Sequence, residues 1–479
     1  MLGLALGAAS CERRPDVGAV IASAPGTKPA LLRAPLADAD LASRLLTDSV
    51  AQGLVQFDAA GQIVPGVAER WIVTDEGRTY IFRLRDMTWA DGRPMRAAEV
   101  VAILRRRLQR RANNPLAPYL TALDTIVEMT PEVIQIELTR PRPDLLKLFA
   151  QPEMAIVHPT RRIGTGPMRV VGEIGAVTRL RPIPDPNRAA DEQTEPEPED
   201  DVLLIAERPA AGIARFARRR SDLFTGGTVG EFPLLTAAGI APADIRLDPA
   251  AGFFGLAVIR RDGFLGSSEN RAAIAMTIDR PAMARSFTAD WQVAESLLPA
   301  ALDSSSPPAA AAWQAVAAAD RQGLARARVQ AWRTAGNPAP ELRLALPANA
   351  GGTLLWARLA ADLYAIGVRP VRVAPDAEDA DLRLLDAVAP FDSGRWYLDQ
   401  ACHPCGEAAS QAIEAARLAP SLAERSRAIA AADRLLAEDV AFIPLAHPLR
   451  WSLVAQRLRT WQANDRAWHP LNGVRRNPN

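Results

Sequence analysis

The side chains with the greatest chemical potential in this sequence lie in one short stretch, Cys402-His403-Pro404-Cys405. Two cysteines at this spacing form a redox-active pair at a helix N-terminus, where the helix end lowers the pKa of the first thiol. The spacing equally suits a local disulfide in an oxidising compartment, two free thiols, or a metal held by both cysteines and His403. We expect a structural disulfide between Cys402 and Cys405, because no strand-to-helix context of the thioredoxin kind is evident around them.

The rest of the chain offers no catalytic or metal-binding pattern. Its four histidines, His158, His403, His447 and His469, are scattered, and none forms the His-x-x-x-His or Glu-x-x-His pair of zinc enzymes. The Gly-x-Ser-x-Gly turn of hydrolases and the Gly-x-x-x-x-Gly-Lys phosphate loop are also missing. We therefore predict no catalytic residues, no metal site and no cofactor, and we do not expect an enzyme.

Length and composition are those of a globular protein with more than one domain. At 479 residues the chain exceeds a single small core, so two or three domains are expected. The net charge of +1 gives no broad field that would attract nucleic acid or anionic lipid. Only Lys28 and Lys147 are lysines among the cations, and we interpret the arginine excess as genomic composition bias.

Strand and helix patterns alternate along the chain. Apolar residues alternate over 80–85 and 133–138, which predicts strands, and they recur at helical spacing over 100–108 and 353–366. Ser421 and Glu424 form a capping-box pattern that opens a helix, and 440–445 is expected to be a buried strand. This mixture predicts an α/β or α+β architecture. The acidic, proline-rich stretch 182–201 is expected to be a solvated loop.

The beginning of the sequence resembles the end of a secretory signal. Small and apolar residues precede Cys11, and the order Ala8-Ala9-Ser10-Cys11 resembles the lipobox of bacterial lipoproteins, in which the cysteine is lipidated. An ordinary cleaved signal and a buried free cysteine are the alternatives for Cys11. We expect residues 1–11 to be a signal remnant and 12–35 a tether rich in Arg, Pro, Gly and Ala. No later stretch has the length of about 20 apolar residues that a membrane-spanning helix needs.

Six short motifs between Thr47 and Leu108 carry a family resemblance. They are Gly53-Leu54-Val55, the turn at 58–61, Pro65 to Trp71, the strand 80–85, Trp89-Ala90-Asp91-Gly92 and the helix from about Ala97. Their order and spacing resemble the extracellular solute-binding proteins of the peptide and nickel class, family 5, which serve ABC importers. Gly164-Thr165-Gly166-Pro167 and the helix 268–281 resemble later landmarks of the same family.

The resemblance implies a two-lobed periplasmic binding protein fold, α/β and of class II type, with an extra subdomain inserted in the first lobe. The first lobe would comprise 36–54, 161–251 and 441–479, the subdomain 55–160, and the second lobe 252–440. The solute, a peptide or peptide-like molecule by family default, would lie between the lobes. The partners implied are an ABC permease and ATPase, and the location is the periplasm, with membrane contact only through a lipid anchor on Cys11.

The same resemblance nominates ligand-binding residues. Thr165 and Gly166 belong to the Gly-Thr-Gly-Pro turn near the expected cleft. Trp396, Tyr397 and Asp399 fall where peptide-binding relatives place aromatic walls and a carboxylate for the peptide ammonium. The Asp-x-Asp-Pro motif that is usual in these relatives is missing from this sequence. The alternatives that stay open are a core tryptophan with a surface aspartate, an envelope redox or metal-handling protein using Cys402 and Cys405, and a degenerate relative that binds a protein partner.

Overall fold

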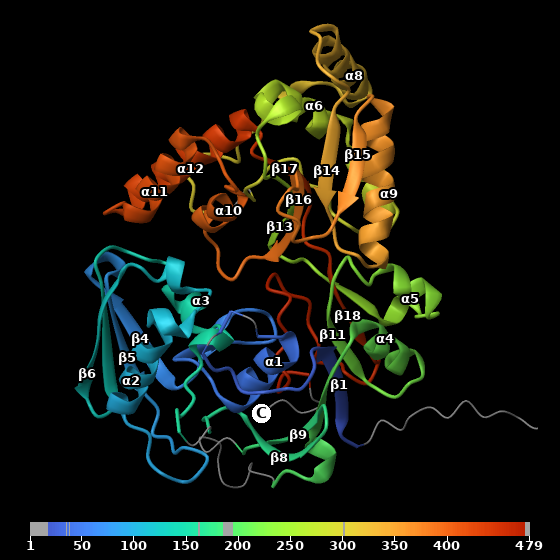
Figure 1. Cartoon of the computed structure of the whole chain (residues 1–479). Helices are drawn as coiled ribbons and strands as arrows, with labels where there is room; N and C mark the ends of the chain where they lie inside the picture. Colours follow the sequence, from blue (N-terminus) through green and yellow to red (C-terminus); the bar gives the residue numbers. More distant parts are fainter. Residues whose placement is uncertain are drawn as a thin grey trace, which may run out of the picture.

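The computed structural model describes residues 18–34, 36–37, 39–160, 163–184, 195–299 and 302–474. Within these residues the chain forms two large β-sheets, each with its own helices, and a smaller four-stranded sheet beside the first (Figure 1); two further strands pair only with each other. We call the part built on the seven-stranded sheet the first lobe and the part built on the five-stranded sheet the second lobe. Cys11 and the rest of the predicted signal remnant lie outside the described residues.

The first lobe is a mixed sheet whose strands come from distant parts of the chain. Its order is β12-β18-β11-β1-β10-β9-β8, and α1 (Leu41–Val50), α4 (Pro209–Ala217) and α5 (Pro233–Ala237) belong to the same lobe. The strands are β1 (Val20–Pro25), β8 (Met168–Ile174), β9 (Val177–Pro182), β10 (Val202–Glu207), β11 (Leu223–Gly227), β12 (Ile245–Asp248) and β18 (Arg450–Val454).

Strand β1 corrects the predicted tether. Residues 20–25 were expected to be part of a linker over 12–35, but they form a strand that pairs in parallel with both β10 and β11. The strand has only six residues, VIASAP, and its central residues Ala22, Ser23 and Ala24 are small and buried. Small side chains buried on both faces give no alternation of apolar and polar residues, so the periodicity that marks half-exposed strands is missing here.

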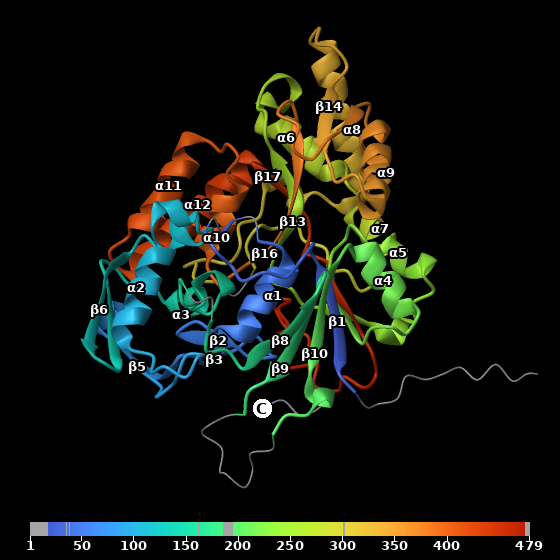
Figure 2. The same ribbon diagram turned by 60° about the horizontal axis from the view of Figure 1, so that its bottom comes forward.

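The inserted subdomain is a four-stranded antiparallel sheet covered by one helix. The predicted strands at 80–85 and 133–138 are confirmed as β5 (Thr79–Leu84) and β7 (Val133–Leu138), and the predicted helix as α2 (Ala97–Arg107). The sheet order is β4-β5-β7-β6, and β5, β6 and α2 lie together at one side of the molecule (Figure 2). The other elements of this region are β2 (Val55–Phe57), β3 (Ile63–Pro65), β4 (Ala68–Thr74), β6 (Leu123–Thr130) and α3 (Leu145–Phe149).

The second lobe packs helices around the sheet β15-β14-β16-β13-β17. Its strands are β13 (Gly252–Val258), β14 (Glu341–Ala345), β15 (Arg369–Val373), β16 (Leu382–Val388) and β17 (Phe442–Ala446). Its helices are α6 (Ser268–Thr277), α7 (Arg280–Arg285), α8 (Ala318–Thr334), α9 (Ala350–Ala365), α10 (Gly394–Ala401), α11 (Glu407–Leu418) and α12 (Leu422–Asp439). The predicted cap is confirmed, because Ser421 Oγ accepts a hydrogen bond from the Glu424 N–H.

Strand β17 moves a second predicted boundary. The second lobe was expected to end at 440, but 442–446 pair with β13 in the second sheet. The chain therefore crosses between the two sheets at 249–251 and again at 447–449, where it returns to β18. These two crossings form the hinge between the lobes. The other predicted domain limits stay predictions.

The ion cluster around Asp201 allows the stability of the first-lobe sheet to be tested. The Asp201 side chain is fully buried, and it accepts hydrogen bonds from Arg179 and from Arg181, whose Nε lies 2.7 Å from Oδ1. Burial alone would raise the pKa of Asp201, but these hydrogen bonds outweigh it and the pKa is lowered. The ionised carboxylate is therefore the form that the fold stabilises.

We predict that Asp201→Asn lowers the melting temperature by several degrees at pH 7. A depressed pKa stabilises the fold above the unfolded value of about 3.9, and this contribution is lost as the pH falls through the folded pKa. The difference between variant and wild type should therefore shrink below about pH 4 in thermal melts. Glu199→Gln, an exposed acid in the adjacent turn, is the matched control. A constant difference across pH 3 to 7 would contradict the role of the charge.

Candidate functional site

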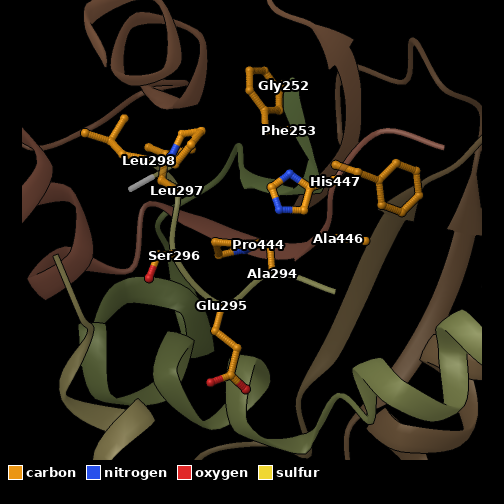
Figure 3. Close-up of a pocket in the computed structure, with 12 residues that line it drawn as sticks. Gly252, Phe253, Ala294, Glu295, Ser296, Leu297, Leu298, Pro444, Ala446 and His447 are labelled. Atoms are coloured by element: carbon orange, nitrogen blue, oxygen red, sulfur yellow. The ribbon is translucent and has the colours of Figure 1, made fainter. Parts of the chain in front are cut away.

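A pocket of about 300 Å³ lies where the second lobe meets the hinge. Its walls come from the start of β13, from the loop 294–299 and from the end of β17 with the first crossing residue. The lining residues are Gly252, Phe253, Phe254, Ala294, Glu295, Ser296, Leu297, Leu298, Pro299, Pro444, Ala446 and His447 (Figure 3). We call this cavity the hinge pocket.

Most of the residues that line the hinge pocket are apolar, and only two of them, Glu295 and His447, are ionisable. The carboxylate of Glu295 is paired with the guanidinium of Arg321, with 3.3 Å between Nη2 and Oε2. The imidazole of His447 projects into the space between the walls (Figure 3). Burial lowers the pKa of His447, so the neutral imidazole is the form present at pH 7. A mostly apolar cavity with a few polar groups is the usual form of a small-molecule site.

A second cavity, of about 370 Å³, lies between Pro143 of the subdomain and the start of α12. Its charged lining groups, Asp303 and Arg425, pair with each other at 3.1 Å. Arg425 also donates to Ser393 Oγ and to the carbonyl of Ala416. Because these charges satisfy one another, the hinge pocket is the better candidate for a binding site.

Thr165 and Gly166 lie against the end of α1 and do not line the hinge pocket. The Gly166 N–H donates to the Val50 carbonyl at 3.0 Å, and a Cβ on Gly166 would lie only 2.4 Å from the Val50 carbonyl carbon. Thr165 is buried, and its carbonyl accepts a hydrogen bond from Gln52 Nε2 at 2.6 Å. The turn therefore holds two backbone segments in close contact, and a ligand contact for these residues stays a prediction.

Trp396 and Tyr397 stand behind the hinge pocket. Both are buried on α10, and their rings pack against Phe253 with centroid distances of 5.1 and 6.2 Å. Phe253 is itself a wall of the pocket. These aromatics position the wall, whereas direct contact with a solute stays a prediction.

Asp399 faces the inserted subdomain. Its Oδ2 accepts a hydrogen bond from the Tyr119 hydroxyl at 3.2 Å, and that hydroxyl accepts one from Gln400 Nε2 at 3.0 Å. The guanidinium of Arg395 lies over the Tyr119 ring at 5.2 Å. Burial and the charge of Asp399 raise the pKa of Tyr119, so the phenol stays protonated and donates. In this structure Asp399 therefore joins the second lobe to the subdomain.

Cys402 and Cys405 are joined by a disulfide in the turn between α10 and α11. The Cys405 sulfur lies 3.3 Å from Ser410 Oγ on α11. Within the described ranges, no cluster of three or more His, Cys, Asp or Glu side chains is arranged to hold a metal ion. The pair thus links the two helices that approach the subdomain.

Sequence reasoning missed a set of contacts between the subdomain and the second lobe. The carboxylate of Asp392 pairs with Lys147 of α3 and with Arg466 of the C-terminal segment. We call these three residues the charge bridge. Burial alone would raise the pKa of Asp392, but hydrogen bonds from Lys147 and Arg466 lower it. The one available signal was the rarity of lysine, since Lys147 is one of only two in the chain.

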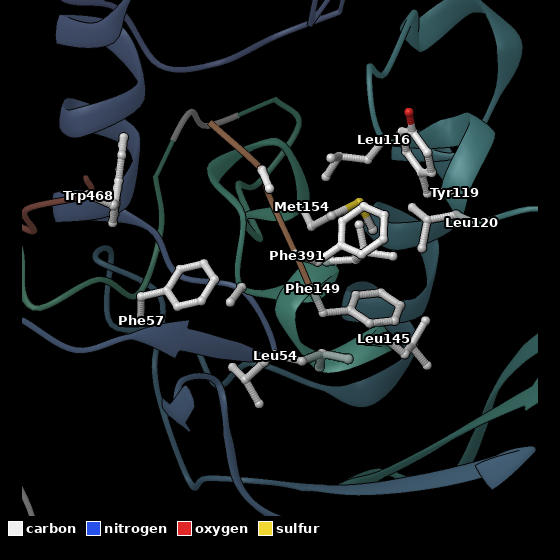
Figure 4. Packing of buried hydrophobic residues seen from close by; sticks show 14 of the residues in the cluster. Leu54, Phe57, Leu116, Tyr119, Leu120, Leu145, Phe149, Met154, Phe391 and Trp468 are labelled. Carbon is white, nitrogen blue, oxygen red and sulfur yellow. The ribbon is translucent and has the colours of Figure 1, made fainter. Parts of the chain in front are cut away.

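Neighbouring contacts extend this interface. The carbonyl of Arg417, at the end of α11, accepts hydrogen bonds from Arg142 Nη2 at 2.6 Å and Arg140 Nε at 2.8 Å. Phe391 of the second lobe inserts among apolar side chains of the subdomain, with its ring 5.1 Å from that of Tyr119 (Figure 4). The two parts are thus held together by charge, hydrogen bonds and apolar packing.

Comparison with known proteins agrees with this geometry. The family model described as "Bacterial extracellular solute-binding proteins, family 5 Middle" matches residues 62–331. A 70-residue segment, 14% of this chain, is 41% identical to the probable deoxycholate-binding periplasmic protein YgiS of Escherichia coli, and spans 13% of that relative. Within the described residues, no helix has the length and hydrophobicity that crossing a bilayer requires.

Solved structures show the same fold. The Escherichia coli murein tripeptide binding protein MppA superposes with a TM-score of 0.75 at 17% identity, over 94% of this chain and 97% of MppA. Haemophilus influenzae OppA in complex with the peptide RPPGFSPFR gives 0.72 at 16% identity, over 94% and 97%. The predicted α/β, two-lobed fold of periplasmic binding proteins is confirmed.

The charge bridge predicts the arrangement of the lobes in solution. Removing the ammonium group in Lys147→Met leaves Asp392 without its subdomain partner, and a partly exposed pair of this kind contributes up to about 1 kcal/mol. The ratio of open to closed molecules should rise by roughly fivefold. Small-angle X-ray scattering should then record a larger radius of gyration than for wild type.

Lys28→Met is the control, because Lys28 is exposed and lies 4.0 Å from its nearest acid, Glu173. The control should scatter as wild type does. An unchanged radius of gyration in Lys147→Met would show that the hydrogen bonds and apolar packing hold the subdomain on the second lobe without the Lys147–Asp392 pair.

Proposed function

The chain belongs to family 5 of the bacterial extracellular solute-binding proteins, and from this premise we propose that it is the substrate-binding component of an ABC importer. The observation that carries the proposal is the hinge pocket, a partly enclosed apolar cavity beside the two crossings that join the lobes. The protein would capture a small solute there and deliver it to a membrane permease whose ATPase drives transport. No step of this role requires a catalytic group.

The proposed solute is a peptide or peptide-like molecule. Two proteins of the same fold are named for a murein tripeptide and for bound RPPGFSPFR, which supports this class. YgiS, which matches a short segment at higher identity, is named as a probable deoxycholate-binding protein. Fold similarity argues the architecture better than the ligand, so the class needs a direct test.

The proposed mechanism is closure about the hinge. A solute would first contact the second lobe, which supplies all the lining residues of the hinge pocket except His447 of the hinge. It would then stabilise the closed arrangement, in which the charge bridge and the Tyr119–Asp399 hydrogen bond join the subdomain to the second lobe. A ligand shifts such an equilibrium only through its different affinity for the two states.

The proposed location is the periplasm, with the chain held at the membrane by a lipid on Cys11. Extracellular binding proteins act outside the cytoplasm, and the family assignment supports export. The anchor rests on the sequence alone, because Ala8-Ala9-Ser10 precede the cysteine as in a lipobox. A lipid anchor would keep the binding protein near its permease.

We predict that a pool of tripeptides stabilises the protein and that sugar, opine and nickel panels do not. A ligand at 100 times its Kd adds about 2.7 kcal/mol to the free energy of unfolding, which raises the melting temperature measurably. Leu297→Trp, which places an indole in the hinge pocket, should abolish this rise. Leu324→Trp on the exposed face of α8 is the matched control. Stabilisation by another panel alone would replace the peptide assignment.

We also predict that Cys11 carries lipid in the expressing bacterium. Growth with an alkyne-labelled fatty acid should label the wild-type protein and leave Cys11→Ala unlabelled. Cys402→Ala with Cys405→Ala, which removes the other two cysteines, should label as wild type does. Equal labelling of Cys11→Ala and wild type would contradict the anchor.

A further inference from the structure

His447 is held so that its ring points into the hinge pocket. The residue follows β17 directly, and its N–H donates to the Gln292 carbonyl at 3.0 Å. Its own carbonyl accepts a hydrogen bond from Trp291 Nε1 at 2.7 Å. The backbone is therefore fixed on both sides, while the imidazole projects between the pocket walls (Figure 3).

The imidazole has unused hydrogen-bonding capacity. Among the described residues, none forms a hydrogen bond with its ring nitrogens, and the residue is only partly exposed. A neutral imidazole carries one N–H donor and one acceptor nitrogen. Both are left for a molecule that enters the pocket.

The charges around His447 are already matched. On the loop 294–299, the Glu295 carboxylate pairs with Arg321 and points away from the imidazole (Figure 3). Asp386 on β16 and Arg450 on β18 form an ion pair at 2.8 Å. The segments of β13 and β17 that line the pocket contribute no ionisable side chain. The pocket thus holds no free carboxylate for an ammonium group.

We propose that His447 recognises a carboxylate of the solute, an inference that rests on the proposed function and names the charge that the site selects. A carboxylate would accept the imidazole N–H and would favour the imidazolium form. Binding near pH 7 would therefore take up a proton from solvent onto His447. The apolar body of the solute would lie against Phe253, Leu297 and Leu298.

The test uses two matched pools of mixed-sequence tripeptides, one with free C-termini and one C-terminally amidated. Wild type should bind the free acids about tenfold or more tightly than the amides in titration calorimetry at pH 6.5. His447→Gln should bind both pools equally. His403→Gln, at an exposed position in the disulfide turn, should keep the wild-type preference.

Nuclear magnetic resonance of labelled histidine in the wild-type protein gives a second measurement that needs no foldable variant. The pKa of the His447 imidazole should rise when the free-acid pool is added and should stay unchanged with the amides. Equal binding of both pools with an unmoved pKa overturns the role of His447 and leaves peptide binding intact. Binding of neither pool removes the proposed peptide function, and this inference with it.

Discussion

The structure depends on the two chain crossings, 249–251 and 447–449. They connect the antiparallel strand pair β12–β18 of the first-lobe sheet to the antiparallel pair β13–β17 of the second-lobe sheet. Asp248 pairs with Arg450 at the end of the first-lobe ladder, and Phe254 pairs with Ala446 in the second-lobe ladder. Between these pairs the ladder is interrupted at Gly252, whose φ of +151° is rarely adopted by residues with side chains. A Cβ there would also lie 2.1 Å from the Ala387 carbonyl oxygen. Glycine is therefore required at the point where the ladder breaks, and the hinge pocket lies beside it.

The first-lobe side of the hinge is held by the C-terminal segment. The carboxylate of Asp248 accepts a hydrogen bond from the Asn464 N–H at 3.1 Å and lies 3.0 Å from His469 Nε2. The Ala251 N–H donates to the Asp465 carbonyl at 2.7 Å. The last part of the chain thus fixes the crossing on the side of the first lobe. In the proposed closure, rotation between the lobes would be confined to the few residues that remain.

The sequence predicted those elements whose pattern is local. Strands β5 and β7 alternate, α2 repeats at helical spacing and Ser421 caps α12, so each was recognisable from its own residues. Strand β1 was missed because its small side chains are buried in the middle of a sheet, where alternation disappears. The small residues at the centre of this strand, Ala22, Ser23 and Ala24, also suit a tether.

The hinge pocket could not be predicted, because it is a property of long-range packing. Its walls bring together Gly252, Leu297 and His447, which are far apart in the sequence. Thr165 and Gly166 were recognisable as a motif, yet the motif reports a close backbone contact with α1. Trp396 supports the wall of the hinge pocket through Phe253, and its contact with a solute stays a prediction. The sequence motifs therefore identified residues that support the backbone and walls around the hinge pocket, and they did not identify the residues that line it.

On the proposed function, the pairing of the carboxylates in the second lobe disfavours a cationic group on the solute. Asp392 is paired with Lys147 and Arg466, Asp399 with Tyr119, and Asp386 with Arg450. A cationic group that sought Asp392 or Asp399 would have to displace Lys147 or Tyr119. Each displacement breaks a contact that holds the second lobe on the subdomain, so a cation bound there would favour opening. An anionic group at His447 competes with none of these pairs, and its binding is therefore compatible with closure.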